Sequence, residues 1–435
     1  MRPKTATLLL MMLALLPGLA GAAEDLLQAY AQARTSDPVL AAAEAARGGA
    51  REELGQARAP LLPQWTLAWT QEHQRLAGSS EQRSRELQHR ISQVLLDFSR
   101  MARLRSAQAR DEGQQALLQA ARQALLVRVA QAYFGVLSAS DALATVQANE
   151  DAFARQVQQA QARFAAGLGA QVDIEQARTY HALARANTVA ARKALLDARE
   201  ALAEITGSPT GSLKPLSQDL AALPPEAAER DTWVTQALRD NPALRAEQLA
   251  LSASEQALDA ARAAHLPTLS LALESGRHWP PTAGAGSGAG AGRSDTTLGL
   301  SLSLPLFAGG ATEAQRRQAA YQRDGAREAL EQRRRRVVRE TLAQFDAVQL
   351  GAAQLDSTRS AVEAAGRALA ATQTGQELGT RSMTDLLLAI QNQAAAQGAY
   401  SQARHQYVLA RLQLRQAAGA IDETHLAAVN ALLQE

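Results

Sequence analysis

Residues 57–67 read ARAPLLPQWTL and residues 261–271 read ARAAHLPTLSL, at a constant offset of 204 positions. At the same offset, Ser36-Asp37-Pro38 corresponds to Asp240-Asn241-Pro242. Farther along, Gly167 and Asp173 correspond to Gly379 and Asp385 at an offset of 212. Self-similarity of this kind indicates structural units that pack side by side. The chain is therefore predicted to contain two copies of one module, and this symmetry argues against a single enzyme active site.

Each repeated stretch leads into segments in which apolar and polar residues alternate. We expect strands at 64–73 and 85–96 in the first half, and at 268–277 and 296–306 in the second. In the last of these, leucine occupies every second position from Leu298 to Leu306. A tilted transmembrane strand needs ~9–11 residues, and the alternation is typical of outer membrane barrels. An ordinary hairpin of a soluble sheet is the alternative, and the presence of two matched hairpins favours the barrel.

The segments between the hairpins predict unusually long helices. From Ser99 to Phe164, apolar residues recur at steps of seven, three and four, and Val348, Leu355, Val362 and Leu369 are strictly seven apart. Such spacing is typical of a coiled-coil seam. The first long helix would reach on the order of 100 Å at ~1.5 Å per residue. Return helices are expected at 170–206 and 381–418, and single helices at 25–58 and 231–263 lead into the strands.

The N-terminus has the pattern of a secretory signal peptide. Arg2 and Lys4 are basic, Leu8 to Leu16 is apolar, and Ala20-Gly21-Ala22 fits a cleavage site. An uncleaved anchor is the alternative interpretation. The expected organisation is a signal peptide at 1–22, a first repeat at 23–207 that turns at 167–170, an irregular equatorial connector at 208–230, a second repeat at 231–420 that turns at 376–381, and a C-terminal segment at 421–435.

Composition and motifs argue against enzymes and nucleic-acid binding. The chain has no cysteine, so it has neither a disulfide framework nor a thiolate metal site nor a lipidated cysteine. Its seven histidines form no H-E-x-x-H pair, and no G-x-S-x-G nucleophile motif occurs. Without residues 1–22 the acidic and basic residues balance, and the Arg333–Arg336 run has acidic neighbours. We therefore expect no catalytic residues, no cofactor, no bound metal and no nucleic-acid partner.

Four strands are too few to close a membrane barrel. The smallest single-chain barrels have eight strands, and open edges in lipid would leave backbone groups without partners. Several copies of the chain must then contribute to one barrel. Three copies give twelve strands and two give eight, and the sequence by itself does not choose between them.

Several short motifs now resemble those of a known family. The chain resembles the TolC-type outer membrane efflux proteins over essentially its whole mature length. The residues that carry the resemblance are Ser36-Asp37-Pro38, Ala59-Pro60-Leu61-Leu62-Pro63-Gln64, Tyr133-Phe134, Arg163-Phe164-Ala165-Ala166-Gly167-Leu168, Ile205-Thr206-Gly207, Leu304-Pro305-Leu306-Phe307-Ala308-Gly309-Gly310, Gly379-Thr380-Arg381 and Asp385-Leu386-Leu387. Each motif is weak alone, and their order within a duplicated frame makes the resemblance specific.

The resemblance implies a mainly α fold with a transmembrane β-barrel. Its form would be a homotrimer whose twelve-stranded barrel in the outer membrane of a Gram-negative bacterium continues into an α-helical tunnel in the periplasm. The function implied is the passive exit duct of tripartite multidrug efflux pumps or type I secretion systems. The implied partners are a periplasmic adaptor protein, an inner-membrane pump or ABC transporter, and outer membrane lipid. The cargo, whether drugs, metals or polypeptides, stays open.

The resemblance also assigns roles to residues at the two helix turns. It implies adaptor docking at Gly167, Leu168, Gly379 and Thr380, and a periplasmic gate at Asp173, Arg381 and Gln376. Gln376 stands where the family has a tyrosine, so some hydrogen bonds of that gate are missing. Asp385 matches an acidic residue that lines the constriction and binds cations, whereas the second acidic position of the family is Leu388 here.

A different kind of protein also fits part of the sequence. A periplasmic or surface coiled-coil structural protein without a pore would explain the heptads, the repeat and the export signal. It would not explain two amphipathic hairpins of membrane-spanning length. Extraction separates the two, because a barrel requires detergent.

Overall fold

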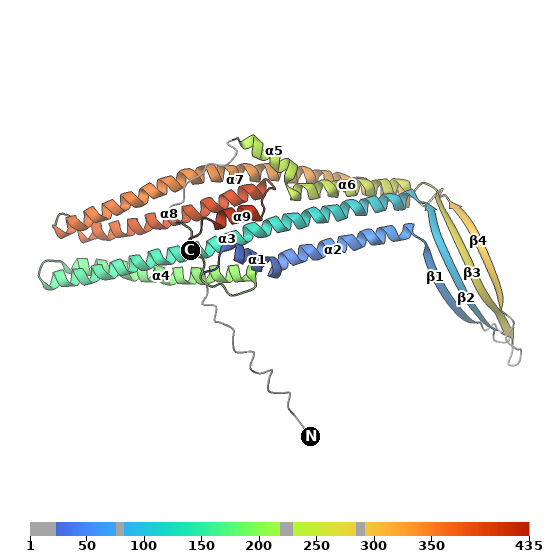
Figure 1. Cartoon of the computed structure of the whole chain (residues 1–435), viewed down its shortest axis with the longest axis horizontal. Coiled ribbons are helices and arrows are strands. Elements are labelled where there is room, and N and C mark those ends of the chain that lie inside the picture. The colour runs from blue at the N-terminus through green and yellow to red at the C-terminus, as the bar shows by residue number, and fades with distance from the viewer. Residues whose placement is uncertain (1–22, 75–81, 218–228, 284–291, 435) are drawn as a thin grey trace, which may run out of the picture. The chain divides into compact units, whose positions relative to one another are not determined.

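The computed structural model describes residues 23–74, 82–217, 229–283 and 292–434 (Figure 1). The signal peptide predicted for residues 1–22, and residues 218–228 of the predicted connector, lie outside the described residues. The described chain is mainly helical and carries one four-stranded antiparallel sheet, which confirms the coarse fold prediction. Among the described helices, none combines the length and the apolarity needed to cross a bilayer.

The same order of elements occurs twice along the chain (Figure 1). The first series comprises α1 (Leu26–Ser36), α2 (Pro38–Arg58), the 3-10 turn η1 (Ala59–Leu61), β1 (Gln64–Gln74), β2 (Gln82–Leu96), α3 (Phe98–Ala165) and α4 (Gln171–Thr206). The second comprises α5 (Arg230–Asp240), α6 (Pro242–Ala263), β3 (Thr268–Ala283), β4 (Arg293–Ser303), α7 (Ala311–Glu377) and α8 (Met383–Ala417), and α9 (Glu423–Asn430) follows it.

Two of the helices predicted from the sequence are each divided by a proline. The helix expected at 25–58 breaks between α1 and α2, and the one expected at 231–263 breaks between α5 and α6. The residue before a proline is disfavoured in the α region. Asp37 and Asn241 accordingly have extended backbones, with ψ of 118° and 116°. The prediction of two unbroken helices was therefore wrong.

The strand ends also differ from the sequence prediction. Strand β4 was expected at 296–306 but ends at Ser303. Pro305 has no N–H to donate to a sheet, which ends the strand before it. Leu306, which the leucine alternation placed in the strand, lies outside the sheet and is 90% exposed. Conversely, β2 begins earlier and β3 ends later than predicted.

The chain forms two compact units. One comprises residues 1–41, 122–239 and 339–435, and the other comprises 42–121 and 240–338. We call them the turn unit and the sheet unit, after the helix turns and the sheet that they contain. Helices α3 and α7 contribute residues to both.

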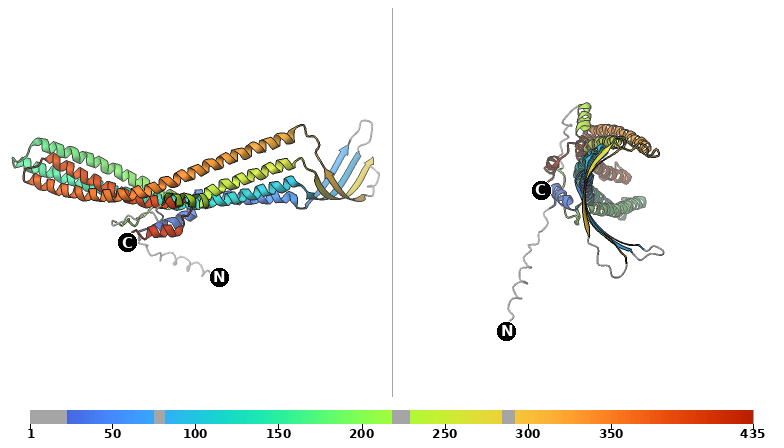
Figure 2. Two further views of the ribbon diagram at one scale, coloured as in Figure 1. Left: turned by 90° about the horizontal axis from the view of Figure 1, so that it is seen from above. Right: turned by 90° about the vertical axis from the view of Figure 1, so that its right-hand side faces the viewer.

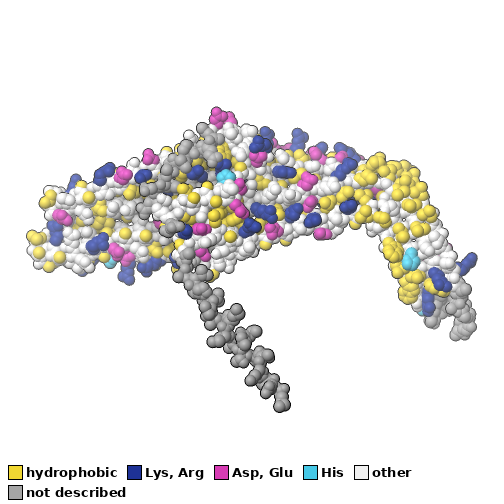
Figure 3. All heavy atoms as spheres, in the orientation of Figure 1, with side chains coloured by type: hydrophobic (Ala, Val, Ile, Leu, Met, Phe, Trp, Pro, Cys, Tyr) yellow, Lys and Arg dark blue, Asp and Glu magenta, His cyan; other side chains and the backbone are white. Residues whose placement is uncertain are grey.

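The sheet unit holds the four strands in the order β1-β2-β3-β4, each antiparallel to its neighbour (Figure 2). Residues directly opposite each other lie on the same face of a sheet. One such row runs Trp65, Ile91, Leu273 and Leu298, so all four strands give apolar side chains to one face. Hydrophobic side chains gather on the sheet in Figure 3. The most exposed of them are Trp65, Leu67, Trp69, Leu298, Leu300 and Leu302, each more than 60% exposed. We call this surface the apolar face.

Side chains fix the corner where the first hairpin meets its helices. Arg100 donates from Nη1 to the carbonyl oxygen of Pro60 at 2.8 Å and pairs with Asp97 at 3.0 Å. Gln93 donates to the carbonyl oxygen of Leu61 at 2.8 Å. Prolines leave carbonyl groups of this turn without backbone partners, and these long polar side chains satisfy them. In the first repeat, the side chains of Arg100 and Gln93 therefore hold the proline-rich motif in place where the chain enters β1.

In the turn unit, a buried tyrosine joins segments that are distant in sequence. The Tyr133 hydroxyl lies 3.0 Å from the carbonyl oxygen of Glu24 and 2.9 Å from that of Lys214. Burial raises the pKa of this hydroxyl far above its ordinary value. Glu24 also pairs with Leu213 in a parallel bridge. The start of the described chain and the connector are thus both anchored to α3.

Candidate functional site

The two helix-hairpin turns of the turn unit have the same backbone motif. Gly167 and Gly379 have φ of 72° and 75°, a left-handed conformation that side chains with a Cβ rarely adopt. Each glycine N–H bonds a carbonyl three residues back, at 2.9 and 3.2 Å. The next N–H, of Leu168 or Thr380, bonds a carbonyl five residues back at 2.8 Å. This is the Schellman motif, which satisfies the last carbonyls of α3 and α7.

An aspartate is the third residue of each return helix. Asp385 Oδ2 accepts a hydrogen bond from the N–H of Ser382 at 3.1 Å, and Ser382 Oγ accepts one from the N–H of Asp385 at 3.1 Å. This reciprocal pair is a capping box. In the first turn, Asp173 Oδ2 accepts from the N–H of Ala170 at 3.3 Å. The two acids thus cap α8 and α4 at equivalent positions of the repeat.

Capping also sets the charge of Asp385. Its pKa is lowered from the ordinary value, first by the backbone N–H of Ser382, then by the Ser382 hydroxyl, and further by the positive charge of Arg381. The carboxylate therefore stays ionised as the pH falls below its usual range. Its other oxygen, Oδ1, has no hydrogen-bond partner among the residues that the structure describes.

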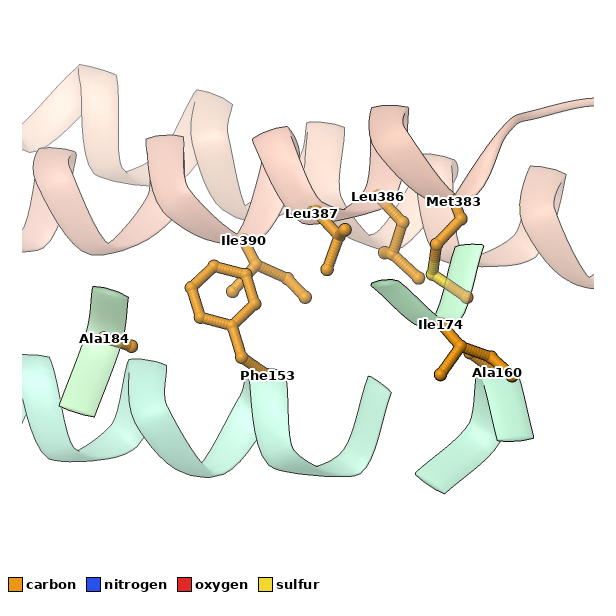
Figure 4. Packing of buried hydrophobic residues seen from close by; sticks show 8 residues of the cluster. All are labelled: Phe153, Ala160, Ile174, Ala184, Met383, Leu386, Leu387 and Ile390. Atoms are coloured by element: carbon orange, nitrogen blue, oxygen red, sulfur yellow. The ribbon is translucent and has the colours of Figure 1, made fainter. Parts of the chain in front are cut away.

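The two hairpins pack against each other close to their turns. A buried cluster joins α3, α4 and α8 (Figure 4), and its members are Phe153, Ala160, Ile174, Ala184, Met383, Leu386, Leu387 and Ile390. Polar contacts reinforce it. Thr384 donates to Gln176 at 2.8 Å, and Arg163 donates to the carbonyl oxygen of Gln376 at 3.4 Å. The buried cluster and these polar contacts hold the two helix pairs together close to their turns.

The turns themselves present apolar side chains to solvent. Leu168 and Leu378 are 72% and 74% exposed, and Val172 and Phe164 are also exposed. The two leucines lie next to Gly167 and Gly379 at the tips. These side chains are accessible to a partner protein.

The structure shows no hydrogen bond or ion pair between the side chains of the predicted gate residues within the described part of one chain. Asp173 and Arg381 form no ion pair within the described residues of one chain. Arg381 packs instead against Gly375, where an added Cβ would lie 2.7 Å from its Cγ. Gln376 is buried, with 4% of its surface exposed. A gate built from Asp173 and Arg381 must therefore form between copies of the chain, and it stays a prediction.

Sequence reasoning missed the structural role of the two aspartates. Ser382 precedes Asp385 by three residues, which is the spacing of a capping box, and this signal was present in the sequence. The contact between Arg163 and the Gln376 carbonyl had no such signal, because it joins residues 213 positions apart. Among the described residues, no group of three or more His, Cys, Asp or Glu side chains could hold a metal ion.

The chain matches known proteins over nearly its whole length. Residues 29–208 and 233–420 match the model of the family described as outer membrane efflux protein. The chain is 32% identical to outer membrane protein TolC of Salmonella enteritidis over 94% of this chain and 85% of that protein. It is 28% identical to the alkaline protease secretion protein AprF of Pseudomonas aeruginosa, over 93% and 86% of the two chains.

Solved structures show the same fold. The outer-membrane channel OprN aligns with a TM-score of 0.80 and 23% identity, over 91% of this chain and 90% of that chain. CusC aligns with a TM-score of 0.81 and 18% identity, over 92% and 93%.

We predict that two glycine-to-alanine substitutions, one in the second turn and one inside α8, change the free energy of unfolding in opposite directions. Gly379→Ala forces a Cβ into a left-handed conformation and should lower the free energy of unfolding by about 1 kcal/mol. Gly398→Ala, inside α8 with nothing within 4 Å of the added Cβ, should raise it by about 0.5–1 kcal/mol. Urea unfolding followed by far-UV circular dichroism measures both. If both variants changed the free energy of unfolding equally and in the same direction, the left-handed turn at Gly379 would be contradicted.

Proposed function

The chain belongs to the outer membrane efflux protein family, and from this membership we infer that it is an outer membrane exit duct for efflux and type I secretion. It lies in the outer membrane, the location stated in the names of its relatives and structural neighbours, and it extends into the periplasm. The earlier resemblance is thereby confirmed. The observation that carries this proposal is a four-stranded sheet with one apolar face and two edges that have no strand partner among the described residues.

The position of the apolar residues supports strands that cross a membrane at a tilt. On β1 the exposed apolar residues centre on Leu67, which lies in the same row as Thr296 of β4. On β4 they centre on Leu300, four residues nearer the helices. Four residues are roughly 14 Å along a strand, and three spacings between strands are also roughly 14 Å. The apolar band therefore crosses the strands at roughly 45°, the tilt of membrane barrels.

The open edges support assembly from several copies. Because β1 and β4 run antiparallel, β4 of one copy can pair with β1 of the next without breaking the alternation of strand directions. Pairing of this kind satisfies every edge N–H and C=O in lipid. Two copies would close eight strands, a barrel whose interior side chains fill. Three copies would close twelve strands and leave a lumen, so the proposal is a homotrimer whose helices form the periplasmic tunnel.

The exposed turns support docking of a periplasmic adaptor protein. Leu168 and Leu378 offer an apolar contact at the tips, and the glycine motifs beside them fix its shape. The duct itself is passive and has no catalytic residues. An inner-membrane pump or ABC transporter supplies the energy. The relative named for alkaline protease secretion supports polypeptides among the cargo classes.

The proposed gate is an ion pair between Asp173 of one copy and Arg381 of its neighbour. Asp173 lies in the first turn of α4, and Arg381 directly precedes the N-cap residue of α8. Neither has an ion-pair partner among the described residues of its own chain. Exposed pairs contribute roughly 0–1 kcal/mol each. Three of them hold a closed end that a docking adaptor can open.

We expect Arg381→Ala to enlarge the channel. In planar bilayers, the purified wild-type oligomer should give small cation-selective current steps, and the variant should give larger ones because the gate pairs are lost. Arg367→Ala is the control, since Arg367 is exposed and lies 4.0 Å from Glu363 on the same helix, α7. Unchanged steps in Arg381→Ala would rule out this gate, and an absence of current in every sample would rule out the duct.

A second channel measurement tests Asp385. Three copies would bring three Asp385 carboxylates to one constriction, where they should bind a multivalent cation. Block by a trivalent cation should weaken about tenfold or more in Asp385→Asn. Ser382→Ala is the matched control, because it removes part of the same cap and keeps the carboxylate. If both variants lose block equally, capping rather than charge at the constriction explains the effect.

A further inference from the structure

The apolar face of the sheet changes character near the strand ends that lie away from the helices. On β3 an arginine, Arg277, lies directly opposite Leu87 of β2. The next pair on the same face is Arg85 of β2 and Trp279 of β3. Both arginines are exposed. Two guanidinium groups thus lie diagonally across adjacent strands, just past the apolar residues.

The charges of the two sheet faces differ sharply. Among the side chains that the structure describes, the apolar face carries no carboxylate. The ionisable residues among these described side chains are Arg85, Arg277, His73 and His89. The carboxylates of the strands lie on the opposite face, and they are Glu72, Glu86, Glu274 and Asp295. There Arg90 pairs with Glu274 at 3.2 Å. Neither Arg85 nor Arg277 has a carboxylate partner among the described residues.

The tilt of the apolar band puts the two arginines at the same depth. The outer limit of the band runs from Trp69 on β1 to Leu298 on β4. Arg85 and Arg277 each lie about three residues beyond this line on their own strands. At ~3.4 Å per residue and ~45° tilt, that is roughly 7 Å along the membrane normal. The headgroup layer outside the hydrocarbon core is about 5–8 Å thick, so both guanidinium groups lie within it.

The site is also partly ordered before anything binds. The Arg277 guanidinium carbon lies 5.4 Å from the centre of the Trp279 ring. Both side chains rest on Gly292, where an added Cβ would come 2.7 Å from Trp279 Nε1 and 2.9 Å from Arg277 Nε. Stacking on an aromatic face reduces the freedom that an arginine loses on binding. Tryptophan is moreover the residue type enriched at membrane interfaces.

From these observations we infer that Arg85 and Arg277 bind the phosphate group of an anionic lipid in the outer leaflet. Guanidinium groups bind phosphate through paired N–H donors, and no described carboxylate competes on this face. Because β2 and β3 are the inner strands of the sheet, pairing between copies through β1 and β4 leaves the site open to lipid. The inference rests on the proposed barrel, which sets the depth of the two residues.

Titration of the purified oligomer with diphosphoryl lipid A in neutral detergent tests this site. Binding is counted by native mass spectrometry for the wild type, the double variant Arg85→Gln/Arg277→Gln, and Arg90→Gln. We expect the double variant to bind lipid A about thirty-fold more weakly, from two interfacial arginines. Arg90→Gln removes a charge from the opposite face of β2 and should change binding less than twofold. Equal affinity of the wild type and the double variant overturns the inference.

Two further measurements test whether the arginines recognise the phosphate of the lipid or free phosphate. Dephosphorylated lipid A should bind the wild type as weakly as it binds the double variant. Inorganic phosphate in excess should not displace the lipid, and displacement would assign the arginines to free phosphate instead. The same preparations are tested in planar bilayers. Wild-type current with unchanged lipid binding in the double variant refutes only the lipid site, whereas a lack of wild-type current refutes the proposed duct.

Discussion

Backbone hydrogen bonding at the sheet edges is the constraint on which the rest of this protein depends. The described part of the chain contributes four strands, and within it the outer edges of β1 and β4 have no strand partner. In the proposed barrel each unpaired N–H or C=O in lipid would cost several kcal/mol, and pairing with another copy of the same sheet would remove this cost. Contact with lipid would likewise remove the exposed tryptophans and leucines of the apolar face from water. The proposed function therefore couples folding of the sheet in the membrane to assembly.

Each copy of the duplicated module contributes one hairpin to the four-stranded sheet. Each module consists of two short helices, an antiparallel strand hairpin, and two long helices joined by a turn. Gly167 and Gly379 end their helices with the same motif, and Asp173 and Asp385 lie at equivalent positions in the first turns of the next helices. The two copies differ at the caps of their return helices. Only Asp385 has a serine as its capping partner, and only the second turn carries an arginine beside the cap.

Much of this architecture could be predicted from local sequence patterns. Alternation of apolar residues gave the hairpins, the heptads gave the long helices, and the glycines gave the turns. Local patterns were wrong where a proline overrides them, at Pro38 and Pro242 inside helical periodicity and at Pro305 inside a run of alternating leucines. Contacts over long sequence separations could not be predicted at all. The match of Arg85 with Trp279 depends on strand register, which no single segment encodes.

The number of chains in the detergent-solubilised oligomer tests the central claim most directly. Sedimentation equilibrium in a density-matched detergent measures the protein mass without the micelle. The account predicts a mass of three copies of the chain and no stable monomer, because a single four-stranded sheet cannot satisfy its edges. A monodisperse monomer that keeps its sheet would contradict it, and a stable dimer would contradict the twelve-stranded barrel.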